Sequence, residues 1–287
     1  MDALTKLGLS KGTKLLIIHA DDAGLSHAEN SATIAALKAG TVNSYSIMTT
    51  CPWFKEVADF ALEKDEFDYG VHLTLTCEWK NYKWGPILSK TEVPSLVNSQ
   101  GNFYSSRDDF KKHATAEDVK RELHAQIEKA YDLGLNPTHL DSHMYTLGLK
   151  SEFLEAYKEI GAEYKLPVFL NRQLIEDCGL NADQCLNERD FVIDNVVLGD
   201  YEVFKNGGLY DFYDSSLDKL VEGVNIVLIH PAFDTQEMQG VTIEHPNFGS
   251  EWRQIDYDYF TSQKCKQKII DNGIQLITWK EIKSVLY

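Results

Sequence analysis

The strongest constraint on the fold is the alternation of short apolar runs with amphipathic segments along the whole chain. The runs at 14–20 and 224–230 are almost continuously apolar, which is typical of parallel strands covered on both faces. Amphipathic segments such as 116–133 separate these runs, and here Thr115 and Gly134 provide the expected start and stop signals. Strands that alternate with helices indicate a parallel β/α architecture.

The expected elements form one domain that spans residues 1–287. About seven strand–helix units predict a single β/α barrel of about seven parallel strands. An open doubly wound sheet is the alternative, but no G-x-G-x-x-G motif follows the first strand. Ser26 and Glu29 match a capping box at the start of the first helix. The expected strands lie at 14–20, 42–48, 69–76, 138–141, 167–170, near 191–197, 224–230 and 274–279; the expected helices lie at 26–39, 54–64, 116–133, 150–164, near 215–221 and 256–272, and a long loop insertion lies at 77–115.

Charge and composition exclude several classes of partner. The 28 basic and 44 acidic residues give a net charge of −16 with histidine neutral, without a visible basic stripe, which argues against nucleic acid. No apolar run approaches the roughly 20 residues of a membrane span. The N-terminus lacks the apolar region of a signal peptide, and the five cysteines form no C-x-x-C pair. We therefore expect a reduced, cytoplasmic protein; its oligomeric state stays open, a homodimer included.

Histidine and aspartate gather where the expected strands end. Five of the nine histidines and three aspartates occupy such positions, and the active sites of β/α folds lie at the carboxyl ends of the strands. The first strand end carries Asp21 beside Asp22, two carboxylates that repel each other unless a cation lies close by. The alternative is an acidic turn that interacts with the dipole of the next helix.

Other strand ends supply typical metal ligands. His72 follows Gly70, and His139, Asp141 and His143 occupy alternate positions that face one way while the strand stays extended. We expect the strand to end near Asp141, so only some of them reach a metal and the others orient the ligands. Two histidines and one carboxylate leave coordination positions open for water and substrate, and a free carboxylate nearby can accept the proton of the water. The alternatives are a hydrogen-bonded core histidine at 72 and a polar barrel interior at 139–143.

Four further residues are candidates for catalysis, for orienting a catalytic carboxylate or for substrate binding. His230 could donate a proton to a leaving group, or be a structural residue fixed by the following proline. Arg253 could orient a catalytic carboxylate, or pair with an acid of its own helix. Trp252 could stack on a sugar, and Trp84 of the insertion could line a carbohydrate cleft or simply hold the loop in place. The sequence contains neither a G-x-S-x-G nucleophile motif nor a Walker-type phosphate loop.

Four short blocks together resemble one known family. The sequence is similar to the YdjC-like carbohydrate deacetylases, also called ChbG/HpnK-type, in HADDAG at 19–24, GVHLTLT at 70–76, THLDSHMY at 138–145 and IHPA at 229–232. The resemblance spans most of the chain. It implies a deacetylase-type β/α barrel, one divalent metal ion and hydrolysis of the N-acetyl group of an amino sugar.

The same resemblance implies roles for single residues. Asp21 would be the general base and His230 the general acid. Asp22, His72 and His143 would hold a Zn²⁺ or Mg²⁺ ion.

Two further positions follow from the same blocks. His139 would help to orient the metal ligands without contacting the metal itself. Tyr145 replaces a histidine that the family usually has, and it is expected to lie near the substrate.

The expected function is therefore metal-dependent deacetylation of an N-acetylated sugar, either a monosaccharide or a short oligosaccharide. A metal-dependent phosphoester hydrolase or a sugar isomerase on the same barrel is an alternative. A third alternative is a non-catalytic protein that binds a sugar without converting it.

Overall fold

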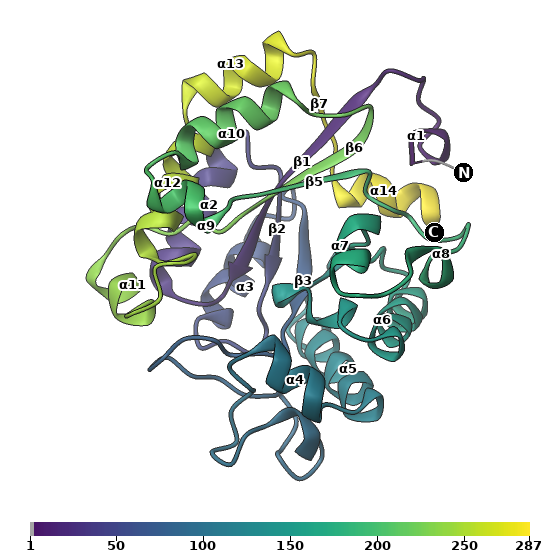
Figure 1. Ribbon diagram of the computed structural model, residues 1–287, viewed down its shortest axis with the longest axis vertical. Coiled ribbons are helices and arrows are strands. Elements are labelled where there is room, and N and C mark those ends of the chain that lie inside the picture. Colours follow the sequence, from purple (N-terminus) through teal and green to yellow (C-terminus); the bar gives the residue numbers. More distant parts are fainter. Residues whose placement is uncertain (1–2) are drawn as a thin grey trace.

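The computed structural model describes residues 3–287 and contains one parallel sheet (Figure 1). The order of the strands is β4-β3-β2-β1-β6-β5, and β7 pairs with the start of β1 on the side opposite β6. Every strand pair is parallel, as the alternation of elements predicts. The strands are β1 Lys14–Ala23, β2 Ser44–Ile47, β3 Tyr69–Leu73, β4 Leu140–Ser142, β5 Asn195–Leu198, β6 Gly223–Ile229 and β7 Gln275–Leu276.

The sheet curls, and only isolated bridges connect its two edge strands. Val168 bridges to Leu140 of β4, and Asn171 bridges to Ile193, just before β5. The strand expected at 167–170 is thus reduced to single bridges. The predicted barrel-type α/β architecture is confirmed, with a weakly paired segment between β4 and β5, and the open doubly wound alternative is not observed.

Helices connect the strands and cover the outside of the sheet (Figure 1). In α5 the Thr115 side chain accepts a hydrogen bond from the backbone of Asp118, and Val119, Leu123 and Ile127 form the buried face, as their spacing predicts. The helices are α1 Ala3–Lys6, α2 His27–Ala39, α3 Phe54–Glu63, α4 Arg107–His113, α5 Ala116–Asp132, α6 Ser151–Tyr164, α7 Arg172–Asp177, α8 Ala182–Cys185, α9 Tyr201–Lys205, α10 Leu209–Asp218, α11 Gln236–Val241, α12 Ser250–Phe260, α13 Gln263–Asp271 and α14 Trp279–Leu286, with 3₁₀ segments η1 Pro94–Leu96 and η2 His143–Gly148.

The structure corrects three of the predicted boundaries. The helix expected at 256–272 is two helices, because the Ser262 side chain caps α13 and ends the run of α12. The strand expected at 274–279 has only two residues, since Thr278 and Glu281 form a capping box that starts α14. The helix expected near 215–221 lies earlier, as α10.

The insertion at 77–115 is packed against the rest of the protein. Its aromatic residues Trp79, Trp84 and Phe103 are buried in the same core cluster as the barrel strands. It contains η1 and α4, although the sequence predicts a loop for this whole segment. None of the helices within residues 3–287 is long and apolar enough to cross a membrane.

Candidate active site

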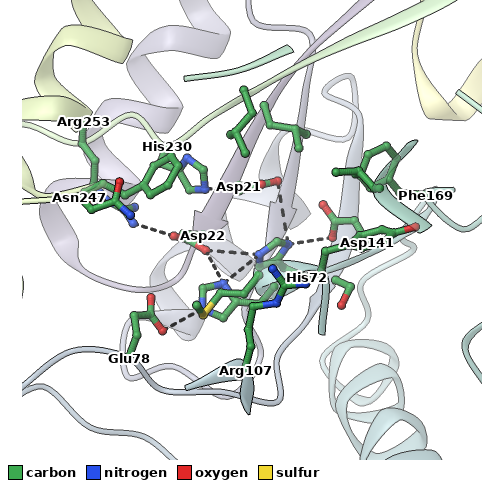
Figure 2. A pocket seen from close by; sticks show the side chains of 18 of the residues that line it. Asp21, Asp22, His72, Glu78, Arg107, Asp141, Phe169, His230, Asn247 and Arg253 are labelled. Atoms are coloured by element: carbon green, nitrogen blue, oxygen red, sulfur yellow. Dashed lines mark hydrogen bonds and ion pairs between the residues drawn. The ribbon is translucent and has the colours of Figure 1, made fainter. Parts of the chain in front are cut away.

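A bulge at the end of β1 places two neighbouring carboxylates in the same cavity. The register between β1 and β2 shifts between Ala20 and Ala23, and Asp22 has a φ of 66°. Aspartate adopts this left-handed conformation more readily than most residues. Consecutive side chains of a regular strand point to opposite faces, so the bulge is what allows Asp21 and Asp22 both to line the cavity (Figure 2).

The three predicted metal ligands converge on one point. Oδ1 of Asp22 lies 3.1 Å from Nδ1 of His143 and 3.3 Å from Nε2 of His72, and these two nitrogens are 3.3 Å apart. Ligands of tetrahedral Zn²⁺ lie roughly 3.3 Å apart when each is about 2.0–2.1 Å from the metal, and octahedral Mg²⁺ requires about 2.9 Å. All three side chains are buried. The donor set therefore fits one divalent cation.

Two other groups of buried ligand-type side chains overlap with this one. Asp21, His72 and Asp141 form one group, and His19, His139 and Asp141 form the other. In both groups Asp141 already receives hydrogen bonds, at 2.9 Å from Nδ1 of His72 and at 2.8 Å from Nε2 of His19. Since these contacts occupy its oxygens, the group of Asp22, His72 and His143 is the best candidate for a metal centre.

Each candidate histidine ligand has its own carboxylate partner on the far ring nitrogen. Asp141 accepts from Nδ1 of His72, and Glu78 lies with Oε2 3.0 Å from Nε2 of His143. Such partners fix the tautomer and leave the other nitrogen free for a metal. Burial alone would lower the pKa of His143, but the carboxylates of Glu78 and Asp22 outweigh it and raise that pKa to about 9.

Arg253 holds the remaining oxygen of Asp22. Its guanidinium group donates to Asp22 Oδ2 and to Glu29 Oε2, both at 2.8 Å, and all three side chains are buried. The predicted orienting role of Arg253 thus has a geometric basis, and the alternative pairing with an acid of its own helix is not observed. The Ser26–Glu29 capping box is only half formed: Ser26 accepts from the Glu29 backbone, while the Glu29 carboxylate turns to Arg253. Burial would raise the pKa of Asp22, yet His143 and Arg253 hold it well below its usual range.

Asp21 and His230 face each other beside the metal-type cluster (Figure 2). Nε2 of His230 lies 3.6 Å from Asp21 Oδ2, and Asp21 Oδ1 lies 3.2 Å from Nε2 of His19. The backbone N–H of His230 donates to Asp256, which fixes the end of β6. Burial lowers the pKa of His230 to about 4.

His139 lies deeper in the barrel than the cluster. Its ring stacks on Trp279 with 5.0 Å between centroids, and it contacts the ring of His19 edge-on. The close approach that Gly70 permits is to this ring, since a Cβ at Gly70 would lie 2.5 Å from Nε2 of His139. His139 therefore supports the site by packing against Trp279 and His19, and it is not one of the three candidate ligands.

The three residues expected to bind substrate lie in different places. Tyr145 lines the cavity, which has a volume of about 290 Å³. Trp84 is buried and donates from Nε1 to the carbonyl of Thr76. Trp252 is buried between Phe248 and Phe204. Within the described residues neither tryptophan reaches the cavity wall, so neither ring has a face open to a sugar.

Several residues that line the cavity were not predicted from the sequence. Glu78, Arg107, His245 and Asn247 line the cavity from loops or from the start of α4. None of them lies at the end of an expected strand, so no sequence pattern marks them; Trp79, which follows Glu78, packs 5.4 Å from the Arg253 guanidinium group. His19 was noted within its motif, but its contact with Asp21 was not predicted.

Known proteins share this fold and sequence over nearly the whole chain. The chain is 31% identical to a carbohydrate deacetylase of Thermus thermophilus, with 100% of both chains covered. It is 28% identical to a carbohydrate deacetylase of Thermoanaerobacter pseudethanolicus, with 94% of this chain and 100% of that one covered. A crystal structure from Enterococcus faecalis, provisionally described as a cellobiose-phosphate cleavage protein, matches with a TM-score of 0.79 and 27% identity, covering 94% and 99% of the two chains. A family model described as YdjC-like protein matches residues 15–271, so the chain belongs to the YdjC-like protein family.

Proposed function

We propose that this protein is a metal-dependent carbohydrate deacetylase that hydrolyses the N-acetyl group of an amino sugar or short oligosaccharide. One observation carries the proposal: the donor atoms of Asp22, His72 and His143 converge within 3.1–3.3 Å, beside the free pair Asp21 and His230. The relatives named carbohydrate deacetylase support the same reaction.

Asp22, His72 and His143 would hold one Zn²⁺ or Mg²⁺ ion. A divalent cation there polarises the amide carbonyl and lowers the pKa of water. Arg253 keeps Asp22 in place, and Asp141 and Glu78 keep the two histidine rings turned toward the centre.

Asp21 and His230 move the protons of the reaction. Asp21 takes a proton from water, whose oxygen bonds to the carbonyl carbon, and the C–N bond breaks as the nitrogen is protonated. His230 is neutral at pH 7 because burial lowers its pKa to about 4. His230 must therefore take up a proton before it can protonate the amine, and Asp21, which faces it at 3.6 Å, holds the proton taken from water.

The test is acetate release from a panel of N-acetyl sugars by the metal-loaded enzyme. Asp21→Asn should lower kcat by about 10²–10⁴, whereas Asp59→Asn, in an exposed ion pair with Lys55, should change nothing. Absence of acetate release from every sugar of the panel, or full activity of Asp21→Asn, contradicts the proposal. Release of inorganic phosphate, isomerised sugar, or calorimetric sugar binding without any product would instead support the three alternatives.

A further inference from the structure

The wall of the active-site cavity carries two kinds of side chain, titratable and apolar. The titratable side chains come from the ends of β1, β3, β4 and β6, from the insertion and from residues 245–253. The chain between His143 and His230 supplies a run of apolar side chains, which we call the apolar wall, while Trp79 and Phe248 of the lining lie outside this stretch. The apolar wall consists of Met144, Tyr145, Phe169, Leu174, Val196, Leu198 and Leu228.

The apolar wall begins directly beside the reaction centre. Leu228 of β6 pairs in register with His19 of β1, two residues before Asp21. On its other side Leu228 pairs with Leu198 of β5, and Val196 faces the same way because it lies two positions earlier. In Figure 2, Asp21 lies between Arg253 and Phe169, and Asp141 lies beside Phe169.

The apolar wall also extends to the protein surface. Met144 and Leu198 are 38% and 40% exposed, although both are large apolar side chains. Exposed apolar surface that continues into a cavity is typical of a ligand site. A ligand group that lies against the apolar wall would shield the side chains of Met144 and Leu198 from water.

The two substituents of the scissile amide differ in polarity, as the titratable and the apolar lining residues of the cavity do. The nitrogen carries the sugar, whose hydroxyl groups would lose hydrogen bonds with water against the apolar wall and gain none in return. Polar partners for a sugar lie outside the apolar wall, at His245 and Asn247. The carbonyl carbon carries the alkyl chain of the acyl group, and the single methyl of an acetyl group is far smaller than a wall built from seven side chains.

We propose that the preferred substrates are N-acyl amino sugars whose acyl chain is longer than acetyl. The inference rests on the proposed function and concerns the same site. The hydroxyl of water bonds to the acyl carbon, the C–N bond breaks and the nitrogen takes up a proton, so the products are a short fatty acid and the free amino sugar. The chain of the acyl group lies along Leu228, Val196 and Leu198.

The test compares N-acetyl-, N-butyryl- and N-hexanoylglucosamine with the metal-loaded wild-type enzyme. We expect kcat/KM to rise with chain length, by up to about fourfold for each added methylene, which corresponds to the ~0.8 kcal/mol for burial of one methylene group. Leu198→Ala should reduce the ratio of the hexanoyl to the acetyl kcat/KM severalfold. Leu62→Ala is the matched control, because Leu62 is similarly exposed at 46% and lies in α3, away from the cavity.

Three outcomes would overturn the inference. If acetate is released but kcat/KM stays flat or falls with chain length, the acyl preference is wrong and the proposed deacetylation stands. If hexyl β-glycosides of N-acetylglucosamine show the gain instead, the apolar wall holds the aglycone. If no substrate of either series is hydrolysed, the proposed function itself fails.

Discussion

Oε2 of Glu78 lies 3.0 Å from Nε2 of His143, on the side of the ring that faces away from Asp22. Asp141 has the same relationship to His72, with its own oxygen 2.9 Å from Nδ1. The two rings use opposite nitrogens toward the centre, and each carboxylate fixes the tautomer that this requires. Burial raises the pKa of Glu78, yet His143 beside it lowers that pKa below the usual range, so Glu78 is ionised.

Glu78→Gln should weaken metal binding about 10- to 100-fold, because the neutral amide no longer holds the proton on Nε2 of His143. Titration of the metal-free protein against a chromophoric chelator measures this affinity without any assay of activity. Glu92→Gln is the control, since Glu92 lies on the same insertion and its carboxylate accepts hydrogen bonds from Ser89, outside the cavity lining. An unchanged metal affinity of Glu78→Gln would contradict this role.

The strongest sequence patterns predicted the fold because burial dictates them. The runs at 14–20 and 224–230 became β1 and β6, whose residues are almost all buried. The short β5, at 195–198, has no fully buried residue, and the strand expected near 191–197 overlaps only part of it. The break between α12 and α13 was missed because one Ser262 side chain makes it, within an amphipathic pattern that continues through both helices.

The residues of the candidate site that lie at the ends of strands could be predicted from the sequence. Asp22, His72 and His143 come together because parallel strands bring their carboxyl ends to one edge. Glu78 was missed since its place depends on the path of the insertion, which no local pattern encodes. Arg253 was singled out, but its partner Glu29 is 224 residues away and looked like a helix cap.

Gly70→Ala should destabilise the protein by about 1–3 kcal/mol, the usual cost of overpacking a core. The new Cβ would lie 2.5 Å from the ring of His139, which is itself stacked on Trp279. Urea unfolding of the metal-free protein measures the loss. Gly240→Ala in α11 is the matched control, because nothing lies within 4 Å of its added Cβ and alanine favours a helix. Equal stability of the two variants would show that His139 can move away.

His230 should make the folded protein less stable in acid. Burial lowers its pKa from 6.5 to about 4, so between these values the unfolded chain binds a proton that the folded chain does not. Stability therefore rises with pH across this window and falls as the pH drops through it, by about 3 kcal/mol in all. Unfolding of the metal-free wild type and of His230→Gln, compared from pH 7 to pH 4, isolates this contribution as a difference. A constant difference would show that the His230 pKa is not lowered.

Zn²⁺ or Mg²⁺ should raise the melting temperature of the metal-free protein, because Asp22, His72 and His143 converge only in the folded state. A ligand at 100 times its Kd stabilises the folded state by about 2.7 kcal/mol, which is a shift of several degrees. His143→Gln removes one donor and should abolish the shift, whereas Asp21→Asn, which leaves the three donors intact, should keep it. The pair separates metal binding from catalysis, since both variants are expected to lose activity. An equal metal-dependent shift in wild type and His143→Gln would place the metal elsewhere, for example at Asp21, His72 and Asp141.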